Sequence, residues 1–324
     1  MIESDLFLPI REHLEAVEAE IARIADSPVG LIHKITNHAI RNGGKRLRPC
    51  LTLLSARAVG EITRDVIALA ALVELTHTAA LIHDDVVDDA QLRRGCSSVN
   101  QVWGNEAAVL AGDHLFARVM VELARQNLVP FMPILALAIN CMCRGQLLEL
   151  ELRKNADVLE HEYLQLTQDK TAELIGAASE LGARGASRCN LAFDALRSYG
   201  MNLGLAFQIT DDVLDIVSDS TALGKPVSSD LRGGRVTLPY IRTLAVAEAG
   251  ERQRLRQIFA LKDLDEGALQ EATCIVHGHD GIQYSRETAG KYAAAAQHAL
   301  NPLPPSPAKE ILVVIASLVV SRCS

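Results

Sequence analysis

Aromatic residues are scarce in this sequence. Phe, Trp and Tyr make up 4% of the 324 residues, whereas apolar residues as a whole make up 49%. β-Strands draw on aromatic and β-branched residues, while packed helices can be built largely from Ala and Leu. The composition therefore disfavours β-sandwiches and barrels and indicates a globular protein made of helices.

Three further absences exclude other classes of protein. The net charge is −8, so the chain lacks the basic balance typical of nucleic-acid-binding proteins. The seven cysteines are scattered, which indicates free thiols in a reducing compartment. The N-terminus carries acids in place of a basic leader, and the apolar run at 311–320 is shorter than the ~20 residues of a membrane span. We therefore expect a cytoplasmic protein with no transmembrane segment and no nucleic-acid partner.

Apolar residues recur at helical spacing along almost the whole chain. Residues 64–89 are mostly apolar and contain neither Gly nor Pro, so we expect a buried central helix there. Similar patterns predict further helices at about 9–25, 106–125, 133–152, 169–181 and 192–219. No linker, repeat or change in composition divides the chain. The sequence therefore predicts one all-α domain that spans residues 1–324.

Four aspartates lie together at the end of the predicted central helix. Asp84 and Asp88 are one helical turn apart, and Asp85 and Asp89 lie beside them. Carboxylates without His or Cys suit a hard cation such as Mg²⁺, which takes one or two protein carboxylates and fills its shell with water and phosphate oxygens. A solvated acidic helix end would explain the same residues, since acidic runs are common.

A second acidic cluster repeats this arrangement. Asp211 and Asp212 are adjacent, Asp215 follows one turn later, and Gln208 precedes Asp211 on the same face. Both clusters lie on apolar helices, which solvation of surface acids does not explain. Two such motifs that face each other across a cavity could hold several metal ions around one polyanion.

Basic residues supply the other half of a phosphate site. Residues 43–49 combine two glycines with Lys45, Arg46 and Arg48, and a flexible backbone that carries cations suits close approach to a diphosphate. The segment is not a Walker loop, because the glycine spacing and the Ser/Thr are missing. Taken alone, such a segment could also be ordinary surface charge.

Further basic groups lie close to the first acidic cluster. Arg93 and Arg94 follow it within a few residues, so acids and guanidinium groups could meet around one ligand. His77 precedes Asp84 by two turns and lies on the same helical stripe. A lone helical histidine is usually structural, but this one points along the line of the acids.

These motifs resemble those of the trans-prenyl diphosphate synthases. The similarity extends over nearly the whole chain, and paired aspartate motifs in this order and context are highly specific. It is carried by residues 44–49, 77–88, 93–95, 170–171, 207–215, 224–226, 230–231 and 237–239. The resemblance implies a helical bundle around a central apolar cavity, the isoprenoid synthase fold. It further implies a homodimeric enzyme that condenses isopentenyl diphosphate with an allylic diphosphate with the help of Mg²⁺.

The resemblance also implies a role for each matched residue. The ligands of two or three Mg²⁺ ions would be Asp84, Asp88 and Asp211, with the auxiliary acids Asp85, Asp212 and Asp215. The diphosphate of isopentenyl diphosphate would contact Lys45, Arg48, His77 and Arg94. The allylic diphosphate would contact Arg93, Lys170 and Lys225, and the developing cation would lie near Thr171 and Gln208. Arg235 stands where the family often has a lysine, which keeps the charge but changes its geometry.

The implied reaction explains why these residue types are needed. The C–O bond of the allylic diphosphate breaks heterolytically, and metal ions with cationic side chains stabilise the leaving group where its charge develops. An apolar cavity must exclude water, which would otherwise quench the carbocation. The released diphosphate is the expected base for the final proton loss, because no matched side chain suits that role.

Small residues precede the first aspartate motif. Ala79 and Ala80 lie one turn, about 6 Å, before Asp84, and Thr76 lies on the next turn. A short-chain enzyme is expected to carry an aromatic floor at the first of these levels. We therefore predict a long product, from hexaprenyl to decaprenyl diphosphate. Alternatively, Ala merely allows close helix packing and another helix supplies the floor, with the candidates Phe116 and Met120.

Other functions remain open. A farnesyl or geranylgeranyl diphosphate synthase would share every motif, and a non-catalytic subunit of a heteromeric synthase would share the fold but have damaged motifs. A terpene cyclase or head-to-head synthase would use the aspartates and Mg²⁺ but would not need Lys45, Arg48 and His77. A di-iron storage bundle would use Glu and Glu-x-x-His pairs, which do not match these clusters.

Overall fold

The computed structural model describes residues 5–41, 44, 46–217, 228–261 and 264–322. Two predicted site residues, Lys45 and Lys225, lie outside the described residues.

Helices make up almost all of the described structure. Its first half contains η1 (Asp5–Ile10), α1 (Arg11–Ala25), α2 (Gly30–Arg41), α3 (Leu47–Val59), α4 (Arg64–Val87), α5 (Val99–Arg125), η2 (Val129–Phe131) and α6 (Met132–Leu152). The second half contains α7 (Glu160–Thr167), η3 (Gln168–Ala172), α8 (Glu173–Ala186), α9 (Asn190–Val217), α11 (Ser229–Arg232), α12 (Leu238–Val246), α13 (Ala249–Ala260), α14 (Glu266–His277), α15 (Gly281–Ala299) and α16 (Pro307–Ser321). The described strands are β1 (Leu92–Arg93) and β2 (Cys96–Ser97). The all-α prediction is therefore confirmed, with one short hairpin added.

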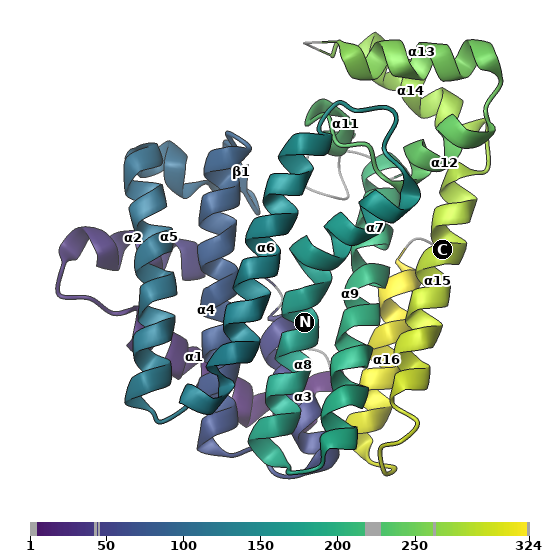
Figure 1. Ribbon diagram of the computed structural model, residues 1–324. Helices are drawn as coiled ribbons and strands as arrows, with labels where there is room; N and C mark the ends of the chain where they lie inside the picture. Colours follow the sequence, from purple (N-terminus) through teal and green to yellow (C-terminus); the bar gives the residue numbers. More distant parts are fainter. Residues whose placement is uncertain (1–4, 42–43, 45, 218–227, 262–263, 323–324) are drawn as a thin grey trace.

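The long helices run roughly parallel to one another, and α13 and α14 lie across one end of the bundle (Figure 1). Helix α4 is apolar around most of its circumference and packs against α1, α3, α5 and α8. The Thr63 side chain accepts a hydrogen bond from the Val66 amide and so caps its first turn. A helix that is apolar on all sides belongs inside a bundle, and the predicted central helix is confirmed.

The hydrophobic core consists of two clusters. The larger one joins α1, α3, α4, α5, α8 and the first part of α9, and the smaller one joins the end of α9 with α7 and α12–α15. Glycines bring the helices of the larger cluster close together. A Cβ at Gly182 would lie 2.0 Å from the Thr52 carbonyl oxygen, and one at Gly200 would lie 2.6 Å from that of Ile175. These contacts fix how closely α8 approaches α3 and α9.

Two helices depart from the predicted boundaries at functional segments. Gly104 has a φ of 82° and interrupts α5, which explains why the regular pattern begins only near Glu106. Residues 168–172 form a π-helix that contains Lys170 and Thr171, where the sequence predicted a plain α-helix from about 169. A π-turn inserts an extra residue and changes which side chains share a face, and such turns are frequent at functional sites.

The hairpin separates two arginines that are adjacent in sequence. Arg93 pairs with Cys96 in the β1–β2 ladder, and the two-residue turn between them consists of Arg94 (φ 54°) and Gly95 (φ 80°). Positive φ at both turn positions is the type I′ geometry that suits tight hairpins. The two guanidinium groups therefore leave the backbone in different directions.

Among the described residues, two helical segments, Arg64–Val87 and Val129–Leu152, are long and apolar enough to cross a membrane by length and composition. The sequence predicted helices at 64–89 and about 133–152 but no transmembrane segment. In the first segment 72% of the apolar window is buried inside the bundle, as in any core helix, whereas in the second only 28% is buried. The second segment, which includes α6, therefore presents an apolar surface outside the core.

Candidate active site

The three aspartates of the first motif have three different environments at the end of α4. Burial raises the pKa of the Asp84 carboxyl to about 6, with a smaller contribution from the negative charge of Asp88, while Lys170 opposes the shift. Asp85 is 3% exposed and accepts hydrogen bonds from Arg93 Nε, at 2.8 Å, and Nη2. Helix α4 ends at Val87, so Asp88 caps it, and its amide still bonds to the Asp84 carbonyl at 2.9 Å.

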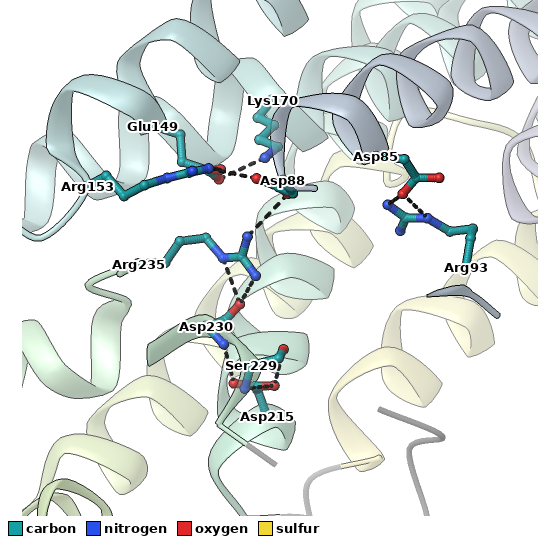
Figure 2. A network of polar contacts seen from close by, with 10 residues as sticks. All are labelled: Asp85, Asp88, Arg93, Glu149, Arg153, Lys170, Asp215, Ser229, Asp230 and Arg235. Atoms are coloured by element: carbon teal, nitrogen blue, oxygen red, sulfur yellow. Dashed lines mark hydrogen bonds and ion pairs between the residues drawn. The ribbon is translucent and has the colours of Figure 1, made fainter. Parts of the chain in front are cut away.

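Asp88 lies between two arginines that come from distant parts of the chain. Its Oδ1 accepts a hydrogen bond from Arg153 Nη2 at 2.7 Å, and its Oδ2 lies 3.5 Å from Arg235 Nη1 (Figure 2). Arg153 follows the end of α6, and Arg235 follows α11. The sequence reading named Arg235 but missed Arg153, which matches no motif.

The aspartates of the second motif also diverge. Asp211 is partly exposed and forms an ion pair with Arg322 Nη1 at 3.2 Å. Asp212 is buried and accepts hydrogen bonds from the Tyr163 hydroxyl at 2.6 Å and the Gln208 amide at 2.8 Å. Burial, together with the negative charge of Asp230, raises the pKa of Asp212 well above its usual range.

Asp215 caps the short helix α11. Its Oδ1 accepts hydrogen bonds from the Ser229 amide at 3.1 Å and hydroxyl at 2.7 Å, and its Oδ2 accepts one from the Asp230 amide at 2.9 Å. The Asp230 carboxylate in turn pairs with Arg235 at 2.8 Å, and Arg235 reaches Asp88 (Figure 2). The two aspartate motifs are thus joined by a continuous set of polar contacts that runs from Asp88 to Asp215, 127 residues later.

Lys170 and Thr171 extend from the π-helix to neighbouring helices. Lys170 Nζ lies 2.7 Å from Glu149 Oε2 of α6, and Thr171 donates a hydrogen bond to Gln208 Oε1 at 2.9 Å. Glu149 is a buried acid that was not predicted from the sequence, because nothing in the sequence distinguishes it from Glu151 on the same helix. These contacts place Thr171 next to Gln208 of the second motif, and the roles that the resemblance implies for Lys170, Thr171 and Gln208 stay predictions.

A second group of site residues gathers around a small cavity beside α4. His77, Arg93 and Arg94 line it, together with Glu74 and Asp85. Burial lowers the pKa of the Arg48 guanidinium to about 10, while the charge of Glu74 opposes this shift and the smaller effect of Arg94 adds to it. Burial, with the charges of Arg48 and Arg94, also lowers the pKa of His77 well below its usual range, which keeps the imidazole neutral. Positive charge is therefore in excess here, as an anion-binding site requires.

The predicted basic segment 43–49 needs one correction. Arg46 does not face a ligand, because it is buried and donates hydrogen bonds to Glu74, at 3.0 Å, and to both carboxylate oxygens of Glu18. Gly44 allows Arg94 to approach closely, since a Cβ at Gly44 would lie 2.5 Å from its guanidinium. Glu74, an acid in the apolar middle of α4 for which no prediction was made from the sequence, balances part of the charge of this arginine group.

The residues at the end of α4 fit a magnesium ion. Among the described residues, no three His, Cys, Asp or Glu side chains lie close enough together to hold one ion by themselves. Mg²⁺ commonly takes only one or two protein carboxylates, so this spacing suits it better than it suits a metal with an all-protein shell. Burial is the main cause of the raised pKa of Asp84, and a bound cation would offset the cost of ionising this buried carboxyl.

The predicted chain-length residues do not all line an open space. Ala80 is partly buried, whereas Ala79 and Thr76 have no exposed surface. Thr76 donates a hydrogen bond to the Leu72 carbonyl within the helix. That Ala79 and Thr76 widen a passage for the product stays a prediction, and Ala80 is the partly exposed small residue one turn before Asp84.

A family model described as polyprenyl synthetase matches residues 29–276 of the chain, which include both aspartate motifs. The chain belongs to the polyprenyl synthetase family. It is a prenyl diphosphate synthase, as its motifs indicated.

Individual relatives cover nearly the whole chain. A short-chain isoprenyl diphosphate synthase of Methanothermobacter thermautotrophicus is 39% identical over 319 residues, 97% of each chain. A decaprenyl diphosphate synthase of Rhodobacter capsulatus superposes with a TM-score of 0.93 at 36% identity over 98% of both chains. A polyprenyl synthase of Caulobacter crescentus, crystallised with calcium and isoprenyl diphosphate, has a TM-score of 0.93 at 36% identity, covering 98% of this chain and 97% of its own. Because these prenyl diphosphate synthases include both short-chain and decaprenyl enzymes, membership of the family leaves product length open.

Proposed function

We propose that this synthase condenses isopentenyl diphosphate with an allylic diphosphate, head to tail, and repeats the step to give a long all-trans polyprenyl diphosphate. The observation that carries the reaction is the pairing of opposite charges along α4. The end of the helix carries the acids of the first motif, whereas two turns earlier the neutral His77 lies among the guanidinium groups of Arg48, Arg93 and Arg94. A diphosphate with its metal ions would bind at the acids at the end of α4, and a second diphosphate would bind at the basic cavity.

Different residues would bind the two substrates. Arg48, His77 and Arg94 would bind the diphosphate of isopentenyl diphosphate, with Lys45 beyond the described residues. Arg93 and Lys170 would hold the allylic diphosphate, together with Lys225. When bound, Mg²⁺ at Asp84, Asp88 and Asp211 would neutralise the leaving diphosphate. Thr171 and Gln208 would turn their oxygens towards the developing cation, and the apolar helices would exclude water.

The decisive experiment is incubation with isopentenyl diphosphate and each allylic starter from dimethylallyl to geranylgeranyl diphosphate, with and without EDTA. We expect Mg²⁺-dependent products of hexaprenyl to decaprenyl length on chromatography. Products that stop at farnesyl or geranylgeranyl diphosphate would replace the long-chain proposal by the short-chain alternative. Absence of any product would instead support a non-catalytic subunit, and full activity in EDTA would exclude the role of Mg²⁺.

Ala80 supports the long product, because it is the small, partly exposed residue one turn before Asp84. In Ala80→Phe, a ring at this level should shift products towards farnesyl or geranylgeranyl diphosphate while the first condensation survives. Ala80→Ser, which keeps the side chain small, should leave the product unchanged. Unchanged products in Ala80→Phe would indicate that another helix limits the product length, with Phe116 and Met120 as the next positions to test.

The separation of the two diphosphate sites can be tested at the hairpin. Arg94→Ala should raise the KM for isopentenyl diphosphate more than that for the allylic substrate, and Arg93→Ala should do the reverse. Losing a charged partner typically costs about 1.5–3 kcal/mol, which is roughly 10- to 150-fold in binding. Equal effects of both changes on both substrates would contradict two distinct sites.

We also propose that the enzyme is a homodimer. Helix α5 exposes Leu110 (68%) and α6 exposes Leu147 (67%), along with Val102, Val109, Val121, Leu137 and Leu150. Large apolar side chains in such numbers favour burial against a second copy. Sedimentation analysis should give a dimer, and Leu110→Glu with Leu147→Glu should shift it towards monomer; a monomeric wild-type enzyme would refute the proposal.

A further inference from the structure

Two oppositely charged side chains at the C-terminal end of α6 contact different parts of the active site. Glu149 and Arg153 are four residues apart and form an ion pair at 3.4 Å. Glu149 Oε2 lies 2.7 Å from Lys170 Nζ, while Arg153 Nη2 lies 2.7 Å from Asp88 Oδ1 (Figure 2). A lysine expected at the allylic diphosphate and an aspartate expected at the metal are thus both held from the C-terminal end of α6, one by Glu149 and the other by Arg153 directly after the helix.

The contacts continue from Asp88 to the second aspartate motif. Arg235 lies 3.5 Å from Asp88 and 2.8 Å from Asp230, and the Asp230 amide donates to Asp215 at 2.9 Å. Charges alternate along the whole series, from Lys170 through Glu149, Arg153, Asp88 and Arg235 to Asp230 (Figure 2). Asp88 is paired with Arg153 and Arg235, and it is the acid of the series that the family resemblance assigns to the metal.

The arginines leave room for a further ligand on Asp88. An ionised carboxylate offers about four acceptor positions on its two oxygens, and Arg153 and Arg235 approach one oxygen each. The side chains of Arg153 and Asp88 are each 25% exposed, so their interaction is less screened by solvent than a surface ion pair. Partners of this kind orient metal-binding carboxylates and typically change metal affinity or activity by about 10- to 100-fold when removed.

We propose that Arg153 is a positioning residue of this synthase, which holds the Asp88 carboxylate in the direction that a divalent cation requires and ties it through Glu149 to Lys170. This inference rests on the proposed use of Mg²⁺. Arg153 acts through Asp88 and does not itself touch the reacting atoms.

The test measures Mg²⁺ binding directly, by isothermal titration of the whole enzyme with Mg²⁺ in the presence of inorganic diphosphate. Arg153→Met keeps an unbranched apolar stem but removes the guanidinium, and we expect its Mg²⁺ affinity to fall about tenfold. Its KM for isopentenyl diphosphate should stay unchanged, because Arg153 has no contact with Arg48, His77 or Arg94. Arg153→Lys, which keeps the charge but loses the planar fork, should fall between wild type and Arg153→Met.

Arg184→Met is the matched control. Arg184 pairs with a buried glutamate four residues away, Glu180, at 2.7 Å, but it lies on α8 away from both aspartate motifs. It should therefore reproduce any loss of thermal stability without a change in Mg²⁺ affinity.

The outcomes separate the inference from the proposed function. If the wild-type enzyme binds no Mg²⁺, the proposed function fails. If the wild type binds Mg²⁺ and Arg153→Met binds it equally well or more tightly, the positioning role is refuted and the proposed function stands. If Arg153→Met does not fold, the same comparison is made with Arg153→Lys, where wild-type affinity would overturn the inference.

Discussion

The two Asp-Asp-x-x-Asp motifs share one sequence pattern, but the fold uses their members differently. In the first motif Asp84 is buried with an incomplete set of counter-charges, and Asp88 is held by two arginines. In the second motif Asp212 and Asp215 accept hydrogen bonds from a tyrosine, an amide and the backbone of α11. The first motif is therefore arranged so that Asp84 and Asp88 can accept a positively charged ligand, whereas two of the three acids in the second motif maintain the structure around Asp211.

This difference also determines how the acids of each motif affect the stability of the folded protein. A carboxylate with a raised pKa is a site at which the folded protein opposes ionisation, and binding a cation relieves it. A carboxylate that accepts three hydrogen bonds is satisfied without a ligand, and its loss leaves donors without partners. Substitutions in the two motifs should thus change activity and stability in different proportions.

The largest expected effect is on turnover. Asp84→Ala or Asp211→Ala should lower kcat by more than about a hundredfold, since loss of a metal ligand should exceed the 10- to 100-fold cost of losing a ligand's partner. The helical fold should survive, as circular dichroism would show. Near-wild-type turnover in either variant would show that the two motifs do not share a metal-dependent step.

The next effect is a stability change that depends on pH and comes from Asp84 of the first motif. The pKa of Asp84 is raised from 3.8 to about 6, so the folded state binds more protons than the unfolded state. The metal-free protein should therefore lose stability as the pH rises from about 4 to 6, and the loss should persist above that range. In EDTA at pH 8, Asp84→Asn should be more stable than wild type by up to about 3 kcal/mol.

Urea unfolding at two pH values checks this prediction. Below pH 3.8, where Asp84 is protonated in both states, the difference between Asp84→Asn and wild type should vanish. A variant that is less stable than wild type at pH 8 would show that Asp84 is already well paired without metal.

A smaller loss of stability is expected in the second motif. Asp215→Asn replaces one acceptor oxygen by an NH₂ group that faces an amide of α11, and one unsatisfied buried donor costs about 2 kcal/mol. Asp194→Asn, at an exposed position on the same helix, should have no effect. Equal denaturation midpoints for both variants and wild type would mean that Asp215 does not anchor α11.

The smallest effect should come from the ion pair at Asp211. The Arg322 and Asp211 side chains are 40% and 39% exposed, and exposed pairs contribute little to stability. Arg322→Met should therefore change the free energy of unfolding by less than about 0.5 kcal/mol. A loss of several times that amount would make the C-terminal end of α16 a structural part of the second motif.

Much of this protein could be predicted from the sequence, because local patterns repeat the geometry of a helix. The helical period of the apolar stretch in α4 is visible from the residues of that stretch alone. Asp84 and Asp88, and likewise Asp211 and Asp215, are spaced one turn apart on any helix. The charges of the two motifs and the basic residues around them depend only on residue type and spacing. The family resemblance followed from those same positions.

Tertiary structure alone decided how the charges pair. Arg153 and Arg235 meet at Asp88 from segments 65 and 147 residues away, and no local pattern records such contacts. Burial also separated two arginines that the sequence could not distinguish. Arg46 donates a hydrogen bond to Glu74, whereas burial lowers the pKa of Arg48 to about 10. The cost of burying a charge depends on what packs around it, and that is set by helices brought together in the folded chain.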